Sequence, residues 1–390
     1  MKVLYLKWDA FGNEYMLREW KQRGYECIIF EFPQKTDDTR HSEELASNVA
    51  KAILANKTDI VFSFNYFPTV AIACKACRVK YVSWTYDSPY IQLYSKTIEY
   101  DTNYAFVFDR AEYNKLRAVG VDTIYYLPMA APVEVYDKMI PGVNHHQRYD
   151  SDVSMIGSMY TEKKHQLFRH LDNLDKYTRG YLDAVMDAQK NIYGASILVS
   201  SLTKEVVENM QKVCPMMASG DGLETIEWVF ANYFLARKVT SEERTELLKA
   251  VSSEHKLKIY TPEKTPLLDR AQNMGAIDYY NESPYAIKCS KINMNISLRS
   301  IVTGIPLRAF DIMGCGGFLL TNYQEDFLEY FEPDKDFVYF DSKEDMLAKI
   351  DYYLKNDSLR EKIALSGHNK VKEYHTFSKR MDSILEIVSS

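Results

Sequence analysis

The sequence lacks any apolar run long enough to span a bilayer. Glycine and proline are sparse, at 15 and 12 of 390 residues, which excludes a collagen-like or disordered chain. The six cysteines show no spacing typical of a disulfide framework. In the N-terminal stretch 1–9 the apolar run is too short for a signal peptide, and an acidic residue follows it at once. These absences predict a globular, cytoplasmic protein.

Strong positive charge is also lacking. Lys and Arg total 48 against 54 Asp and Glu, a net charge of −6, so we expect no nucleic-acid partner. Phosphate-loop and nucleophile-elbow motifs are absent. Cys74 and Cys77 have no second ligand pair, and Asp150 and Asp152 precede a strand instead of following one. The sequence therefore predicts neither a metal site nor a cofactor.

Apolar runs that alternate with helical patterns organise the first part of the chain, which predicts parallel βαβ units. We interpret residues 1–140 as one doubly wound, Rossmann-like domain. The predicted strands are Val3–Leu6, Cys27–Phe32, Asp59–Phe64, Tyr81–Tyr86, Tyr104–Phe108 and Ile124–Leu127.

Proline, glycine and polar residues between 128 and 150 interrupt this pattern and indicate a linker. A strand at Asp152–Ile156 then opens a second Rossmann-like domain, 141–375, with a helical insertion at about 161–253. A last helix, 376–390, is expected to pack back on the first domain. The predicted fold class is α/β, with two doubly wound domains whose strands end at a common cleft.

The most informative stretch is 290–322, which predicts a strand, a basic loop, a helix beginning at Pro306 and a glycine-rich exit to another strand. A helix N-terminus attracts anions, and the guanidinium groups of Arg299 and Arg308 suit phosphate. Asp311 is placed to accept hydrogen bonds from ribose hydroxyls. The alternative is that Arg308 and Asp311 form a surface ion pair on an ordinary helix.

This stretch, from Lys-Ile-Asn-x-Asn-Ile-Ser-Leu-Arg-Ser to Asp-Ile-Met-Gly-Cys-Gly-Gly-Phe-Leu-Leu-Thr-Asn, resembles the C-terminal domain of bacterial glycosyltransferases with the GT-B fold. The most similar group is the spore-maturation, CgeB-like set. The resemblance is specific over about 280–375. It extends to 152–160 and, in the first half, to Trp-Thr-Tyr-Asp-Ser-Pro at 84–89.

The resemblance implies a nucleotide-sugar donor, UDP-linked, bound mainly by the second domain without a metal, and an acceptor bound by the first domain, 1–140. Asp311 matches the acidic residue that binds the donor ribose. The family places an Arg where this chain has Ser158, and Lys163 or Lys164 is the candidate replacement for its charge. The other residues that the resemblance assigns to this site are Gly157, Asn295, Arg299, Arg308, Gly314, Gly316, Gly317, Thr321 and Asn322.

Two carboxylates at predicted strand ends are the catalytic candidates. Asp87 follows the fourth strand and is the candidate base that deprotonates an acceptor hydroxyl. Its alternative role is in a turn, because Asp-Ser-Pro favours one. Asp9 follows the first strand, and its alternative, shared with Asn13, is to cap the first helix. Asp109, after the fifth strand, is a weaker candidate.

The predicted activity is transfer of a sugar from the nucleotide-sugar donor to an acceptor hydroxyl on a glycan or protein. Two other functions remain open at this point: a non-catalytic nucleotide or sugar binding protein, and a nucleotide-sugar epimerase of the same fold. The sequence does not indicate the donor sugar, the acceptor, the stereochemical outcome or the oligomeric state.

Overall fold

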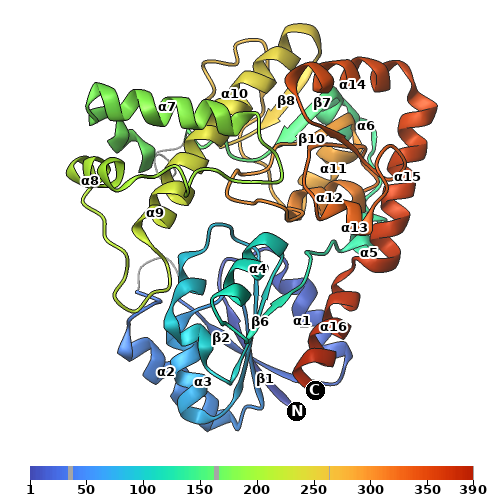
Figure 1. Cartoon of the computed structure of the whole chain (residues 1–390). Helices are drawn as coiled ribbons and strands as arrows, with labels where there is room; N and C mark the ends of the chain where they lie inside the picture. Colours follow the sequence, from blue (N-terminus) through green and yellow to red (C-terminus); the bar gives the residue numbers. More distant parts are fainter. Residues whose placement is uncertain (34–37, 162–166, 263, 390) are drawn as a thin grey trace. The chain divides into compact units, whose positions relative to one another are not determined.

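The computed structural model describes residues 1–33, 38–161, 167–262 and 264–389. The described chain divides into two compact units. Unit 1 comprises Met1–Ala130, Ser219–Glu224 and His375–Ser390, and unit 2 comprises Ala131–Ala218 and Thr225–Tyr374. Each unit contains a parallel β-sheet with helices packed on it (Figure 1). No helix in the described part of the chain combines the length and apolar character that a membrane crossing requires.

The described strands of unit 1 form a six-stranded parallel sheet in the order β2-β1-β3-β4-β5-β6. The central strand β3 is buried along its whole length, as its continuous apolar sequence predicts for a strand covered on both faces. The strands are β1 (Lys2–Lys7), β2 (Glu26–Glu31), β3 (Ile60–Phe64), β4 (Lys80–Thr85), β5 (Asn103–Val107) and β6 (Ile124–Tyr126).

The helices of unit 1 begin and end at the residues that the sequence indicates. The Ser42 hydroxyl caps the second helix by accepting from the Leu45 amide, and Gly24, just beyond the first helix, takes the left-handed φ of +81° that favours glycine. The helices are α1 (Asn13–Gln22), α2 (Glu43–Asn56), α3 (Pro68–Cys77), α4 (Arg110–Ala118) and α16 (Phe377–Ser389).

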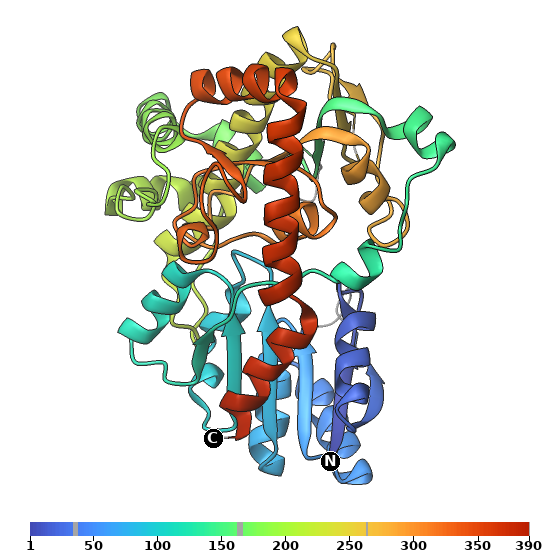
Figure 2. The same cartoon turned by 90° about the vertical axis from the view of Figure 1, so that its right-hand side faces the viewer.

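The C-terminal helix α16 packs against α1 within unit 1, and Figure 2 shows it crossing the first sheet. The Phe377 ring contacts those of Tyr15 and Trp84, with centroids 5.3 and 6.0 Å away. Arg23 at the end of α1 pairs with Asp382 at 2.5 Å. The last helix therefore packs within unit 1, although most of unit 2 lies between this helix and the rest of unit 1 in the sequence.

The described strands of unit 2 also form a six-stranded parallel sheet, in the order β12-β11-β10-β7-β8-β9. Its core combines the buried strand residues with the last helices of the chain. The strands are β7 (Ser151–Ile156), β8 (Leu257–Tyr260), β9 (Gln272–Asn273), β10 (Ser290–Asn295), β11 (Leu319–Asn322) and β12 (Val338–Phe340).

The predicted helical insertion follows β7 and has a hydrophobic core of its own. Residues 219–224, inside this insertion, belong to unit 1, where the Arg40 guanidinium contacts the buried Glu224 carboxylate at 3.0 Å. The insertion contains η4 (Leu167–Asn173), α7 (Lys176–Lys190), α8 (Lys204–Val213), α9 (Ile226–Val229), the π-helical η5 (Phe230–Leu235) and α10 (Ala236–Glu254).

The linker expected between 128 and 150 contains two short helices, α5 (Val133–Tyr136) and α6 (Val143–Tyr149). Gly142 begins α6 as its N-cap residue, and the helix buries Tyr149 against the second sheet's helices. Pro306 is likewise the extended residue before its helix instead of the first helical one. The remaining helices are α5 (Val133–Tyr136), α6 (Val143–Tyr149), α11 (Ser283–Lys288), α12 (Leu307–Gly314), α13 (Phe327–Tyr330), α14 (Lys343–Lys355) and α15 (Asp357–Tyr374).

Candidate functional site

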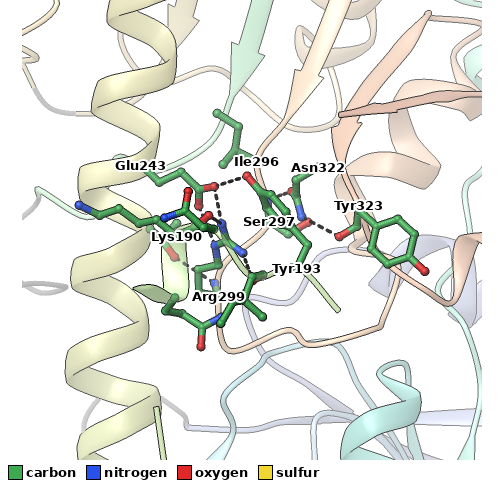
Figure 3. A network of polar contacts seen from close by, with 12 residues as sticks. Lys190, Tyr193, Glu243, Ile296, Ser297, Arg299, Asn322 and Tyr323 are labelled. Carbon is green, nitrogen blue, oxygen red and sulfur yellow. Dashed lines mark hydrogen bonds and ion pairs between the residues drawn. The ribbon is translucent and has the colours of Figure 1, made fainter. Parts of the chain in front are cut away.

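The carboxyl ends of β10 and β11 carry a buried polar network that the sequence analysis had assigned to ligand binding (Figure 3). The Asn295 amide donates to the Thr321 hydroxyl at 2.9 Å and to the Ser297 hydroxyl at 3.1 Å. The Ser297 backbone amide donates to the Asn322 side chain at 2.7 Å. The structure therefore brings Asn295, Thr321 and Asn322 together, and they fix the loop that follows β10.

Arg299 lies in this loop, but its guanidinium group is buried and does not present its N–H groups to a phosphate. It donates to both carboxylate oxygens of Glu243, at 2.8 and 2.6 Å, and to the carbonyls of Ile192 and Lys190, each at 2.9 Å. It also stacks over the Tyr193 ring. Arg299 is 7% exposed and Glu243 5%. The guanidinium group that we expected to bind phosphate is therefore engaged in a buried ion pair, which joins α10 of the insertion to the loop after β10.

Arg244 of α10, which sequence reasoning missed, lies at the glycine turn after β7. Arg244 donates to the backbone carbonyls of Ser158 and Ile296. Its guanidinium lies 3.6 Å from where a side chain at Gly157 would begin. Arg244 therefore brings positive charge to the place where the resemblance expects an Arg. Lys163 and Lys164 lie outside the described residues.

On α12, Arg308 and Asp311 form the ion pair that the sequence left as an alternative, with nitrogen and oxygen 3.3 Å apart. It is not a surface pair, since Asp311 is 1% exposed. The hydroxyls of Tyr136 and Tyr279 both donate to the Asp311 carboxylate at 2.9 Å. Burial raises the pKa of Asp311, although Arg308 and the two hydroxyls favour its charged form. The Arg308 guanidinium also contacts the Ser283 hydroxyl at 3.1 Å.

The glycines after Asp311 allow close packing. A side chain at Gly314 would begin 2.6 Å from the Ala131 methyl, and one at Gly317 would begin 2.7 Å from Ile287. Gly316 has a φ of +77°, in the left-handed region. The glycine-rich turn therefore lets the end of α12 approach its neighbours closely, and this places Asp311 beside Tyr136.

In unit 1, the loops after β3 and β4 are joined through one asparagine that sequence reasoning missed. The Asn65 amide nitrogen donates to the Asp87 carboxylate at 2.6 Å, and the Asn65 amide oxygen accepts from the Tyr86 amide at 3.2 Å. Asn65 itself has a left-handed φ of +57°, which asparagine tolerates well. Asp87 is exposed and oriented by this contact. The signal in the sequence was an asparagine directly after a predicted strand.

Aromatic side chains surround this loop. The Trp8 ring stacks on Tyr86 with centroids 6.1 Å apart, and Phe11 approaches Tyr86 from 6.4 Å while remaining exposed. Asp9, between Trp8 and Phe11, is exposed. Gly12 occupies the N-cap position of α1, so neither Asp9 nor Asn13 is the N-cap residue of this helix, and the Asn13 amide donates to the Trp8 and Ala10 carbonyls instead. Such exposed aromatic faces suit stacking on a sugar ring.

Asp109 is a capping residue, because its carboxylate accepts from the Ala111 amide at the start of α4. Glu112, one turn further on, is the more perturbed group. Burial and then the negative charge of Asp109 raise the pKa of Glu112 to about 8. A strongly shifted carboxyl group near the carboxyl end of a strand is a candidate functional group, and sequence reasoning missed it because its charge environment depends on the fold.

Within the part of the chain that the structure describes, metal-ligating residues do not gather at the predicted site. Among the described residues, two clusters bring together three potential ligands: His146, Asp150 and Cys289, and Glu254, His255 and Asp351. Neither cluster contains a residue of the predicted nucleotide-sugar site.

Residues 240–386 match a sequence family described as "Glycosyl transferase-like". No curated protein sequence matches the chain.

Solved structures share the fold at low identity, and each of the three that follow matches over the whole of this chain. A sucrose-phosphate synthase from Thermosynechococcus elongatus is 10% identical, with a TM-score of 0.58 and 99% of its own chain covered. Anabaena HepE, solved in complex with UDP-glucose, is 11% identical, with a TM-score of 0.57 and 99% covered. A Rickettsia africae glycosyltransferase is 11% identical, with a TM-score of 0.52 and 97% covered. The prediction of a two-domain α/β fold of the glycosyltransferase type is confirmed.

Proposed function

We propose that this chain is a glycosyltransferase that moves a sugar from a UDP-linked donor to a hydroxyl group of a glycan or protein acceptor. The glycosyl transferase-like segment 240–386 contains both ion pairs described above, Arg299–Glu243 and Arg308–Asp311. A structural neighbour solved with UDP-glucose supports a UDP-linked donor. Within the bacterial glycosyltransferases, the motifs at 84–89, 152–160 and 280–375 favour the CgeB-like set.

The observation that carries the proposal is the buried carboxylate of Asp311 beside Arg308 and Tyr279. A carboxylate that already accepts from a tyrosine hydroxyl can accept equally from a ribose hydroxyl, because both are O–H donors. We infer that the donor ribose replaces the Tyr279 hydroxyl on Asp311. Arg308, with the N-terminus of α12, then attracts the diphosphate.

In the transfer step, the acceptor oxygen forms a bond to the anomeric carbon while the bond from that carbon to the diphosphate oxygen breaks. UDP leaves with the electron pair of the broken bond, and positive groups lower the free energy of its developing charge. The acceptor proton passes to the Asp87 carboxylate, which Asn65 orients. Arg308 is the cationic side chain that replaces a metal in this proposal.

The test measures UDP release from a panel of UDP-sugars, with and without a mixture of oligosaccharide and hydroxyl acceptors. A transferase releases UDP slowly by hydrolysis and faster with a suitable acceptor. An epimerase converts the sugar without acceptor-dependent UDP release, and a binding protein turns over nothing. Either of these last results overturns the proposal.

Titration calorimetry with UDP locates the nucleotide. Asp311→Asn should weaken UDP binding, while Asp341→Asn, an exposed residue of the same unit, should not change it. Tyr279→Phe should strengthen UDP binding if its hydroxyl competes with the ribose. Unchanged UDP affinity in a folded Asp311→Asn variant would remove α12 from the nucleotide site.

A further inference from the structure

The cluster of His146, Asp150 and Cys289 in unit 2 is separate from the proposed transfer site. We propose that these three side chains bind one divalent cation of the zinc class. One ligand atom from each residue lies within 4.8 Å of the other two. His146 and Asp150 come from the segment that we expected to be a linker. The sequence did not predict the cluster, because α6 was not predicted.

Two helix ends bring the ligands together. His146 and Asp150 are one turn apart on α6 and its C-cap, with Nδ1 and the carboxylate oxygen 2.8 Å apart. Cys289 is the C-cap residue of α11. The two helices already pack together, because the His145 ring stacks on Tyr285 at 3.9 Å and the Tyr149 hydroxyl donates to Glu282. A cation needs only small side-chain shifts to contact all three groups.

The ligand types select the cation. Calcium and magnesium prefer sites made entirely of oxygen, whereas zinc accepts sulfur, imidazole nitrogen and carboxylate oxygen together. The Cys289 thiol is 8% exposed and makes no hydrogen bond within the described part of the chain. One thiolate and one carboxylate together balance the charge of a divalent ion. The neighbouring Lys258 ammonium is held by the Arg148 carbonyl.

The position of the cluster indicates a structural role. Asp150 and Cys289 directly precede β7 and β10, so the ion would lie at the amino ends of these strands, opposite the edge that carries Asn295. A cavity of about 220 Å³ borders His146 and Cys289. It provides room for a water molecule as the fourth ligand. The ion would join α6 to α11 without taking part in sugar transfer.

The experiment adds Co²⁺ and, separately, Zn²⁺ to the metal-free full-length protein. Cobalt should bind at one ion per chain and give the near-ultraviolet charge-transfer band of a cobalt–thiolate bond. Zinc should displace it and raise the melting temperature, because an ion that binds only the folded state stabilises that state. Absence of the band, or of any stoichiometric binding, overturns the proposal.

Variants identify the ligands. Cys289→Ser should abolish the band, and His146→Ala, at an exposed position, should lower cobalt affinity by at least tenfold while the far-ultraviolet circular dichroism stays unchanged. Cys27→Ser and His255→Ala are the matched controls, since Cys27 is a partly exposed thiol elsewhere and His255 belongs to the thiol-free cluster. A band that persists in Cys289→Ser, or disappears in Cys27→Ser, contradicts the assignment.

Discussion

Arg299 and Glu243 form a buried ion pair across 56 residues of sequence, joined by two hydrogen bonds of 2.8 and 2.6 Å. The pair connects the last helix of the insertion to the loop after β10. Arg299 also donates to the backbone carbonyls of Lys190, at the end of α7, and of Ile192, just after it. The insertion therefore fixes the loop on which the predicted donor-site residues lie, which gives this helical segment a role that its sequence did not indicate.

Removing one partner of this pair should destabilise unit 2. We expect Glu243→Ala to lower the free energy of unfolding by about 3–5 kcal/mol, because it leaves the Arg299 charge buried without its counterion. The matched control is Glu246→Ala, one turn further along α10, whose carboxylate pairs with Lys343 at the surface. Its loss should cost less than about 1 kcal/mol. Urea unfolding of both variants gives the comparison, and equal effects would contradict the structural role of the pair.

The sequence predicted the elements well where local pattern decides them. The strands of the first sheet and β7, β10 and β11 of the second follow from apolar runs and turn signals, whereas β9 and β12 were not predicted. The sequence did not predict α6. We interpreted Pro141 and Gly142 as interrupting regular structure, although glycine can also begin a helix.

The partners of the predicted site residues were not predictable in the same way. Asp311 was recognised from the motif, but Tyr136 and Tyr279, which donate to it, come from separate segments. Arg299 was interpreted as a phosphate ligand because its counterion Glu243 lies on another element. Such pairings depend on the packing of unit 2, and no local pattern carries that information.

Arg308 should contribute to donor binding. We expect Arg308→Ala to weaken UDP binding by about 1.5–3 kcal/mol, the contribution of a charge-assisted hydrogen bond. Arg308→Lys should recover part of the loss, since the charge remains but the paired donors do not. Titration calorimetry measures both variants, with the exposed Lys335→Ala as the control. Wild-type affinity in Arg308→Ala would place the diphosphate elsewhere.

Sugar transfer should not need an added divalent metal. We expect equal rates of UDP release with magnesium, with manganese and after dialysis against a chelator, because the described residues of the predicted site hold no cluster of metal ligands. The same series in Cys289→Ser separates an effect of the proposed zinc ion on stability from an effect of a metal on chemistry. Rates that return only with magnesium or manganese would contradict this prediction.

Glu112 should make stability depend on pH. Burial and Asp109 raise its pKa to about 8, so the folded state holds a proton that the unfolded state releases above its ordinary pKa of about 4.5. Stability from this group is therefore highest at low pH and falls as pH rises to about 8. Glu112→Gln mimics the protonated form and should be more stable than the parent by roughly 1–3 kcal/mol above pH 8. The gain should vanish near pH 5, and a gain that is constant with pH would contradict the raised pKa.

Asp87 is the candidate base, and its contact with Asn65 defines the sharpest test of the transfer mechanism. We expect Asp87→Asn to keep UDP affinity while lowering the rate of transfer by about 10²–10⁴-fold, the usual effect of losing a general base. Asn65→Ala keeps the carboxylate but loses its orientation, so it should lower the rate less. Asp101→Asn is the control, because Asp101 is an exposed carboxylate of unit 1 that pairs with Lys75 at 2.7 Å.

Single-turnover transfer at saturating donor separates these effects from donor binding, and melting curves establish that the variants fold. If Asp87 serves only in a turn, Asn should replace it with little loss of rate, because asparagine also favours turns. A folded Asp87→Asn variant that transfers at nearly the parent rate would exclude Asp87 as the base. The proton would then pass to Asp9 or Glu112, and a large rate loss in Asp9→Asn or Glu112→Gln would identify which of the two accepts it.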